Sequence, residues 1–154
     1  MKVLMVDDDR YEIQALVDIL AVRHPKDEFE STFNLREARN QIWSKKYDAI
    51  VLDIIMPPND EIVPRTSHEA GLISGLRLMD MIRRDRKCPN NRTPITLLTA
   101  SMSDEHPRLK LARRELGKNF VQKPIHPDLL YDVIMKSVKK APVAVPRIRR
   151  RKTQ

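Results

Sequence analysis

The sequence predicts an α/β fold in which five β-strands alternate with five α-helices. Two patterns carry this prediction: short, continuously apolar runs, and longer segments between them whose apolar residues recur every three or four positions. Strands that are apolar on both faces and are separated by amphipathic helices are typical of a parallel sheet with helices on both sides. The chain has 154 residues, which is enough for one domain with a sizeable core.

The elements follow one another in a regular order. The predicted strands cover residues 3–6, 29–33, 49–52, 95–98 and 120–121. The apolar faces that predict helices are Ile13, Leu16, Val17 and Leu20 in the first, Leu76, Met79 and Ile82 in the third, and Leu130, Val133, Ile134 and Val138 in the fifth. The second helix is expected at 35–43 and the fourth at 107–116.

Local residues justify several helix boundaries. Asn34 is expected to cap the second helix, because Glu37 lies three residues further on, as in a capping box. Gly117 is expected to end the fourth helix, since glycine is common just past a helix C-terminus. Pro127 suits the first turn of the last helix, where its missing N–H has no helical partner to lose.

Composition limits the cellular context. Cys88 is the single cysteine, so no internal disulfide can form, and a reducing compartment is expected. No apolar run approaches the roughly 20 residues that span a bilayer. The apolar start of the chain is cut off by Asp7, which is unlike a signal peptide. These features predict a cytoplasmic protein.

The formal charge of +8 is unevenly distributed. Residues 139–154 hold seven basic residues and no acidic one, which leaves 22 basic and 21 acidic residues in the remainder. The body of the chain is therefore nearly neutral overall. We predict one domain over 1–140, followed by a basic, disordered tail at 141–154.

Polar residues follow four of the predicted strands. They are Asp7-Asp8-Asp9 after the first, Asp53 after the third, Thr99 and Ala100 after the fourth, and Lys123-Pro124 after the fifth. The carboxyl ends of parallel strands meet at one edge of a sheet, where ligands bind. Crowded carboxylates repel one another, so Asp7, Asp8 and Asp53 predict an all-oxygen site for Mg²⁺. Because the Thr99 hydroxyl and the Lys123 ammonium are expected beside this site, the expected ligand is a phosphoryl group.

Five stretches of the chain closely resemble the receiver domain of two-component response regulators, in the order expected for that family. They are VLMVDDD, YDAIVLDIIMP, GLRLMDMIRR, TPITLLTA and NFVQKPIHPDLL, and they span nearly all of residues 1–140. The resemblance implies a doubly wound five-stranded sheet with the flavodoxin-like order 2-1-3-4-5. It implies a stand-alone receiver that acts in a phosphorelay.

The resemblance also implies roles for the acidic residues. Asp53 is the implied phosphoacceptor, since a carboxylate is a competent nucleophile toward phosphorus. Asp8 and Asp53 would bind Mg²⁺ directly together with the backbone carbonyl of Ile55, and Asp7 would bind it through water. Lys123 would pair with the phosphoryl group, because phosphoryl transfer needs mostly positioning and charge neutralisation.

A switch is implied by the same resemblance. Thr99, followed by the small Ala100, occupies the position of the switch hydroxyl, and Phe120 that of the switch aromatic. Movement of Thr99 toward a new phosphoryl oxygen would leave room for Phe120 to turn inward. The Lys123–Pro124 peptide bond is expected to be cis.

The chain departs from the family pattern in two places. After Met56-Pro57, a loop insertion of about 58–75 precedes the third helix, and it could cover the pocket, contact a partner or be a surface loop. The tail beyond Lys140 is too short to fold into an output domain. It could be a basic arm or the remnant of a linker.

We therefore expect a phosphoacceptor that receives its phosphoryl group from a histidine kinase or a histidine phosphotransfer protein and then changes its binding to a downstream protein. It is not expected to be an enzyme, beyond self-catalysed phosphorylation from small donors and slow self-dephosphorylation. One alternative is a small fold-related phosphatase that uses Asp60, Glu61 or His68 of the insertion. Another is a protein that binds nucleic acid weakly through its basic tail.

Overall fold

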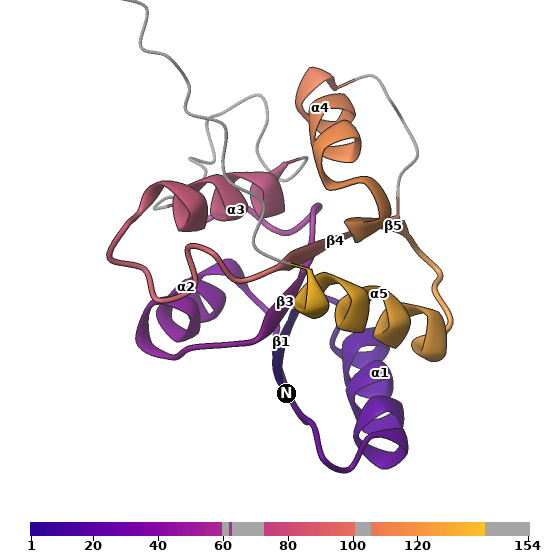
Figure 1. The fold of residues 1–154 in the computed structure, drawn as a ribbon. Helices are drawn as coiled ribbons and strands as arrows, with labels where there is room; N and C mark the ends of the chain where they lie inside the picture. The colour runs from indigo at the N-terminus through magenta and orange to yellow at the C-terminus, as the bar shows by residue number, and fades with distance from the viewer. Residues whose placement is uncertain (60–61, 63–72, 101–105, 141–154) are drawn as a thin grey trace, which may run out of the picture.

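A computed structural model of the chain describes residues 1–59, 62, 73–100 and 106–140. Within these residues the strands form one parallel sheet in the order β2-β1-β3-β4-β5 (Figure 1). The strands are β1 (Lys2–Val6), β2 (Glu28–Thr32), β3 (Ala49–Asp53), β4 (Ile95–Thr99) and β5 (Phe120–Gln122). The predicted doubly wound fold with the order 2-1-3-4-5 is confirmed.

Helices follow each strand along the chain. They are α1 (Arg10–Arg23), α2 (Leu35–Ser44), α3 (Ser74–Arg84), α4 (Pro107–Leu116) and α5 (Pro127–Lys139), with a short 3-10 helix η1 (Gly117–Asn119) between α4 and β5. The predicted bounds of α4 are confirmed. Among the described residues, no helix is both long and apolar enough to cross a membrane.

The second strand is shifted relative to its prediction, while the other four strands and α2 each extend one residue beyond theirs. The second strand lies one residue earlier than predicted, at Glu28–Thr32, because pairing with β1 places Glu28 opposite Lys2 and Thr32 opposite Val6. The predicted insertion at about 58–75 stays a prediction, and its last two residues fall in the first turn of α3, which begins at Ser74. Most of the insertion, at 60–61 and 63–72, lies outside the described residues, as does the predicted tail at 141–154.

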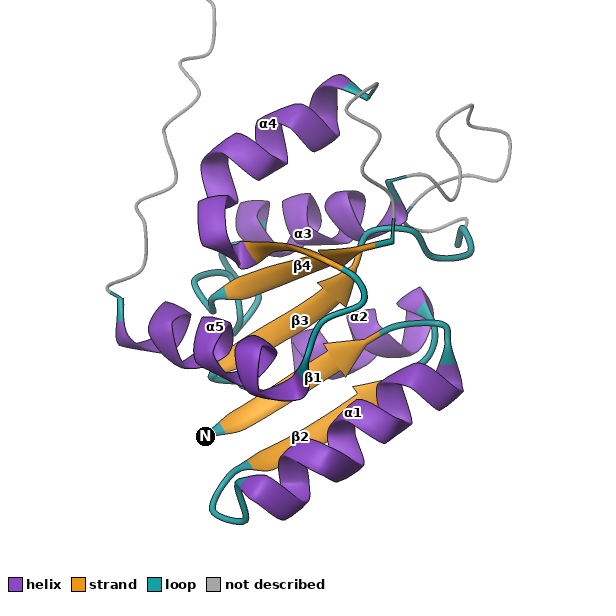
Figure 2. Ribbon diagram, turned by 90° about the vertical axis from the view of Figure 1, so that its right-hand side faces the viewer, coloured by secondary structure: helices purple, strands orange, loops and turns teal. Residues whose placement is uncertain are grey.

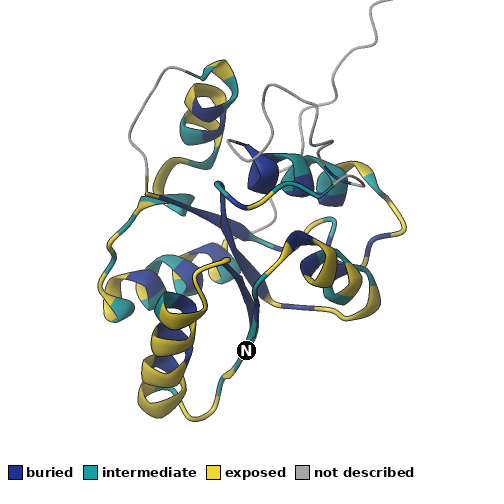
Figure 3. Ribbon diagram, turned by 180° about the vertical axis from the view of Figure 1, so that it is seen from behind, coloured by how far each residue is buried: buried dark blue, intermediate teal, exposed yellow. Residues whose placement is uncertain are grey.

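The sheet has a hydrophobic core on each face, as the continuously apolar strands predict. Figure 2 shows α1 and α5 in front of the sheet and α2 and α3 behind it. On the α1/α5 face, Val3 and Met5 of β1 pack with Leu20 of α1 and Leu130 of α5. On the other face, the alternate residues of β1 pack with α2, α3 and α4. Figure 3 shows the result, with buried strands at the centre and exposed residues on the outer sides of the helices.

Side chains cap four of the helices. Asn34 Oδ1 accepts the N–H of Glu37 at 2.8 Å, which confirms half of the predicted capping box, but the Glu37 carboxylate accepts from Thr32 Oγ1 instead of reaching back to Asn34. Asp9 caps α1. His106 and His126 cap α4 and α5 through Nδ1, each followed by a proline at the first helical position. These two histidines thus have a structural role that the sequence analysis missed.

Gly75, the second residue of α3, lies against the end of β3. Its N–H donates to the carbonyl of Ile54 at 2.9 Å. A Cβ added to Gly75 would collide with the backbone carbonyl of Asp53. Glycine is therefore required at this position by the close approach of two backbones.

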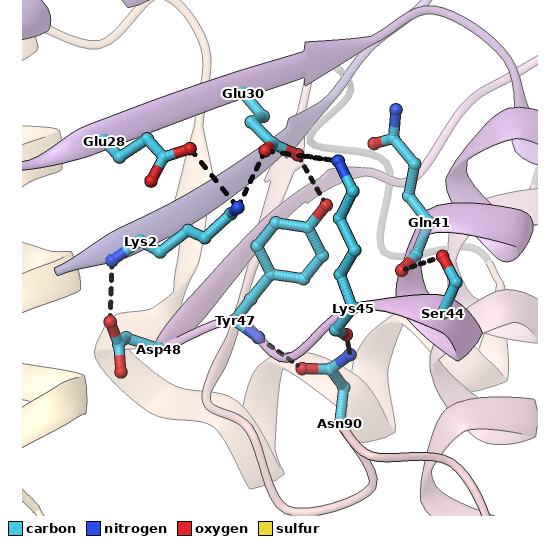
Figure 4. A network of polar contacts seen from close by, with 9 residues as sticks. All are labelled: Lys2, Glu28, Glu30, Gln41, Ser44, Lys45, Tyr47, Asp48 and Asn90. Carbon is cyan, nitrogen blue, oxygen red and sulfur yellow. Dashed lines mark hydrogen bonds and ion pairs between the residues drawn. The ribbon is translucent and has the colours of Figure 1, made fainter.

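Asn90 holds two loops together at the opposite edge of the sheet, where the strands begin. It is fully buried, and its Nδ2 donates to the carbonyls of Ile42 and Lys45, both at 2.6 Å. Its Oδ1 accepts from the N–H of Tyr47 at 2.9 Å (Figure 4). One side chain thereby fixes the α2–β3 connection against the α3–β4 connection.

Candidate functional site

The carboxyl ends of three strands bring the predicted charged residues together. Asp7 and Asp8 follow β1, Asp53 is the last residue of β3, and Lys123 follows β5. Asp7 and Asp53 are buried, with exposed fractions of 1% and 6%, while Asp8 is exposed. The apolar strands place these groups here, because each strand is fixed in register by its neighbours and ends at the same edge.

Lys123 links two of the carboxylates. Its Nζ lies 2.5 Å from Asp7 Oδ2 and 3.2 Å from Asp53 Oδ2, and 3.6 Å from Glu12 Oε2 at the rim. Burial alone would lower the pKa of Lys123, but the hydrogen bond to Asp7 and the charges of Asp53 and Asp7 outweigh burial and raise it. Lys123 is therefore a fixed positive charge between two buried aspartates.

Asp53 uses both of its carboxylate oxygens. Oδ1 accepts the N–H of Ile55 at 3.1 Å, and Oδ2 contacts Lys123. Burial, together with the charge of Asp7, raises the pKa of Asp53 to about 6, against the opposing effects of Lys123 and the Ile55 N–H. The Lys123 ammonium therefore does not fully offset the effects of burial and of the Asp7 charge on Asp53.

The third aspartate of the opening motif serves the helix. The Asp9 carboxylate accepts the N–H groups of Tyr11 and Glu12 at 3.1 and 3.0 Å, as a helix cap does. The backbone N–H of Asp9 donates in turn to Asp7 Oδ1 at 2.9 Å. The triple aspartate is therefore divided between a site of two carboxylates, Asp7 and Asp8, and a cap that orients the first.

The donor set fits Mg²⁺. Asp7, Asp8 and Asp53 each offer a carboxylate oxygen, and these atoms lie within 4.8 Å of one another. Hard oxygen ligands at such spacing suit this cation. Ile55 lies two residues after Asp53, and the role of its carbonyl as a ligand stays a prediction.

These residues surround an open cavity of about 490 Å³. Its lining also includes Ala100, Glu12 and Pro124, and the Lys123–Pro124 bond is cis as predicted. Glu12 is a cavity residue that the sequence analysis missed. It lies three residues after Asp9 in the first turn of α1, but only its contact with Lys123 distinguishes it from other surface carboxylates.

Thr99 and Phe120 lie near the cavity without lining it. Thr99 ends β4, is 1% exposed, and its carbonyl accepts the N–H of Lys123 at 2.8 Å. Phe120 begins β5 and is partly buried, with the Arg113 guanidinium 5.1 Å from the centre of its ring. Asp60, Glu61 and His68, the residues offered for a phosphatase, lie outside the described residues.

Several solved structures share this fold. The Francisella response regulator 1452 receiver domain is 24% identical, with a TM-score of 0.61, and the match covers 90% of this chain and 96% of that one. A two-component response regulator from Clostridium difficile is also 24% identical, with a TM-score of 0.63 and coverage of 91% and 99%. A CheY-like receiver domain protein from Methanospirillum hungatei JF-1 is 20% identical, with a TM-score of 0.65 and coverage of 89% and 92%. At these identities the structural likeness establishes the fold.

The family itself is established at the level of sequence. No curated protein matches the chain. The profile of the response regulator receiver domain matches residues 3–135, which is most of the described fold and includes every residue of the site. The two buried aspartates joined by Lys123 therefore lie at the carboxyl edge of a known kind of domain, and the chain belongs to the response regulator receiver domain family.

Proposed function

We propose that this receiver domain accepts a phosphoryl group on Asp53 from a histidine kinase or a histidine phosphotransfer protein, and that the modified domain changes its binding to a downstream protein. The observation that carries the proposal is the position of Lys123 Nζ between Asp7 and Asp53, at the end of a sheet and beside an open cavity. A phosphoryl group entering there meets a carboxylate nucleophile and a fixed cation together.

The transfer involves one bond made and one broken. Asp53 Oδ2 attacks phosphorus of a phosphohistidine, the P–N bond breaks, and the departing imidazole retains the electron pair and takes up a proton. The N–H of Ile55 holds Asp53 Oδ1, which leaves Oδ2 directed toward Lys123. Lys123 neutralises charge on the phosphoryl oxygens, which is what such a transfer chiefly requires.

Asp7, Asp8 and Asp53 would hold Mg²⁺, with Ile55 contributing its carbonyl. When bound, the cation supplies further positive charge against the carboxylates and the phosphoryl oxygens. Asp7 and Asp8 would hold the metal in place, and Asp9 orients Asp7 through its backbone N–H. The chain's own activity would be limited to phosphorylation from small donors and slow loss of the phosphoryl group.

The switch would act through the end of β4 and the start of β5. The carbonyl of Thr99 is already hydrogen-bonded to the backbone of Lys123, so a displacement at one residue is transmitted to the other. A phosphoryl oxygen that draws the Thr99 hydroxyl toward Asp53 would open space beside β4 for Phe120. The surface near Phe120 and Arg113 would then differ between the two states.

Intact-mass measurement tests the proposal. The protein is incubated with acetyl phosphate and Mg²⁺, and the wild type should gain one phosphoryl group while Asp53→Asn gains none. Asp48→Asn is the matched control, because Asp48 lies at the other end of the same strand and is exposed. Equal labelling of wild type and Asp53→Asn would refute the assignment, and steady turnover of an added phosphoester would favour the phosphatase alternative.

A further inference from the structure

The amino edge of the sheet, where the strands begin, carries an excess of positive charge. This edge is formed by the α1–β2, α2–β3, α3–β4 and α4–β5 connections and by the end of α5. In these described segments, eight cations lie beside three carboxylates. The cations are Lys26, Lys45, Lys46, Arg86, Lys87, Arg92, Lys118 and Lys140, and the carboxylates are Asp27, Asp48 and Asp85.

The three carboxylates are occupied within the protein. Asp27 accepts from the amino group of Met1 at 2.8 Å and from the Tyr131 hydroxyl at 2.7 Å. Asp48 Oδ2 accepts the N–H of Lys2 at 2.6 Å. The third, Asp85, accepts from the Trp43 indole at 2.7 Å and from the N–H of Lys87 at 2.8 Å.

Three of the cations converge on a cavity of about 280 Å³. Lys46 and Arg92 line it from two connections and Lys140 from the end of α5. One carboxylate, Asp48, also lines it, and the remaining lining residues are uncharged: Tyr47, Thr93, Pro94 and Val138. In the described part of the chain, none of these three cations has a carboxylate within ion-pair distance. Lys46 Nζ instead donates to neutral acceptors, the Pro89 carbonyl at 2.9 Å and Thr93 Oγ1 at 2.8 Å, which hold the ammonium in place.

The cavity is also preorganised. Asn90 fixes the α2–β3 connection, which carries Lys46, to the α3–β4 connection, which carries Arg92. Arg83 donates to the carbonyls of Asn91 and Thr93, at 3.1 and 2.7 Å, and so anchors the residues on both sides of Arg92. Cations at helix C-termini are common because the helix dipole favours them, but convergence of cations from two connections and the end of α5 on one hollow exceeds that effect.

The surroundings of this hollow indicate the kind of partner. Protein interfaces are centred on apolar and aromatic anchors. The exposed large hydrophobic residues of the described chain lie in α1, α4 and α5, and none lies in the connections of the amino edge. They are Tyr11, Ile19, Val22, Leu111 and Leu129. A surface whose described connections carry exposed cations and no exposed large hydrophobic residue suits the phosphate backbone of a nucleic acid, which is bound chiefly through charge.

We propose that the amino edge, centred on Lys46, Arg92 and Lys140, is a phosphate-contacting surface for duplex nucleic acid. It lies at the end of the sheet opposite Asp53, so it is a second site in addition to the proposed phosphoryl pocket. The chain continues from Lys140 into residues 141–154, whose sequence adds five cations and no acid. The duplex therefore contacts Lys46, Arg92 and Lys140 of the folded domain, and its binding does not depend on the tail alone.

Fluorescence anisotropy with a short labelled DNA duplex of mixed sequence, measured over a salt series on the full chain, tests this. Arg92→Gln/Lys140→Gln removes two edge cations, both exposed. Affinity at low salt should fall by about threefold or more, and the slope of log K against log salt should fall by about 1.8, roughly 0.9 for each lost phosphate contact. Lys110→Gln/Arg114→Gln on α4 removes the same charge elsewhere and is the matched control.

The outcomes separate the explanations. The proposal holds if the edge variant weakens binding and flattens the salt dependence while the α4 variant changes neither. Equal loss in both variants would show a bulk charge effect and overturn it. If only the tail variant Arg149→Gln/Arg151→Gln loses duplex affinity, binding belongs to the tail and the proposal is overturned. The proposal is also overturned if polyglutamate or phosphatidylglycerol vesicles displace the labelled duplex as effectively as unlabelled duplex does.

Discussion

The two edges of the sheet differ in how their charges are placed. At the carboxyl edge, Asp7 and Asp53 are buried beside a single ammonium. At the amino edge, Asp48 and Asp85 accept hydrogen bonds from neutral N–H groups, and the cations are exposed. The described connections of the carboxyl edge hold Asp7, Asp8, Asp9 and Lys123, and those of the amino edge hold eight cations and three carboxylates. The same sheet thus carries opposite charge at its two ends.

The difference between the two edges shows how burial affects the ionisation of a charged side chain and its need for a partner. At the carboxyl edge, burial of Asp53, together with the nearby charge of Asp7, raises the pKa of Asp53. Exposed cations cost little to leave unpaired, because water solvates them. We therefore expect one edge to bind a small charged group tightly and the other to bind an extended anion loosely. Four substitutions can break or sharpen this comparison.

Gly75→Ala should have the largest effect, at the carboxyl edge. The added Cβ would meet the Asp53 carbonyl, so the backbone must move, at a cost of about 3 kcal/mol in the free energy of unfolding. Labelling of Asp53 by acetyl phosphate should also slow. Urea denaturation and intact-mass kinetics measure the two effects. Gly117→Ala is the control: Gly117 has a φ of 53° and no atoms near its missing Cβ, so stability falls by about 1 kcal/mol and labelling is unchanged.

Asn90→Ala should damage the amino edge alone. It leaves the buried N–H of Tyr47 without its acceptor and removes the donor to Ile42 and Lys45, which should lower the free energy of unfolding by about 2 kcal/mol. Labelling of Asp53 in the folded protein should not change. Asn91→Ala on the same loop should stay within about 0.5 kcal/mol of the wild type. A large loss of labelling would show that the two edges are coupled.

Asp8→Ala should weaken Mg²⁺ binding by about tenfold, which corresponds to about 1.4 kcal/mol, because one of three hard ligands is removed. Calorimetric titration with Mg²⁺ measures it. Asp9→Ala provides the contrast, since Asp9 caps α1: stability should fall by about 1 kcal/mol with no change in Mg²⁺ affinity. Unchanged affinity in Asp8→Ala would place the metal elsewhere.

Glu30→Gln should have the smallest effect, and it depends on pH. Burial opposes ionisation of Glu30, but hydrogen bonds from Tyr47, Lys2 and Lys45 outweigh it and lower the pKa of Glu30 to about 2 (Figure 4). A lowered carboxylate pKa stabilises the fold above the unfolded pKa of 4.5 and ceases to do so as the pH falls toward 2. Urea unfolding should show a loss of about 1 kcal/mol at pH 7, shrinking as the pH falls below 4.5. A difference that is constant with pH would exclude the charge as its cause.

The sequence predicted most of the fold, because the periodic apolar residues are the ones that the structure buries. Its errors lie where partners set the boundary. Glu28 looks like a loop residue, and only pairing with Lys2 makes it part of β2. Ser74 begins α3 without a side-chain cap, so no local residue marks the helix start.

The candidate site was predicted where strand ends carry charge, as at Asp7, Asp53 and Lys123. The residues missed act through distant contacts. Glu12 matters because of a lysine 111 positions later in the sequence. Gly75 matters because α3 crosses close to β3, which no local pattern encodes. The basic amino edge was missed because summing charge along the chain conceals its separation in space.

The histidine caps have a consequence for tautomerism. His106 Nδ1 accepts the N–H of Arg108 and His126 Nδ1 accepts that of Asp128, at 3.2 and 3.3 Å. A nitrogen that accepts a hydrogen bond cannot also carry a proton, so each neutral ring must hold its hydrogen on Nε2. Each cap thus fixes the tautomer of its imidazole as well as the start of its helix. The two capped helices are the ones that precede and follow β5 along the chain, so both neighbours of the strand that leads to Lys123 begin with an imidazole held in a single tautomer.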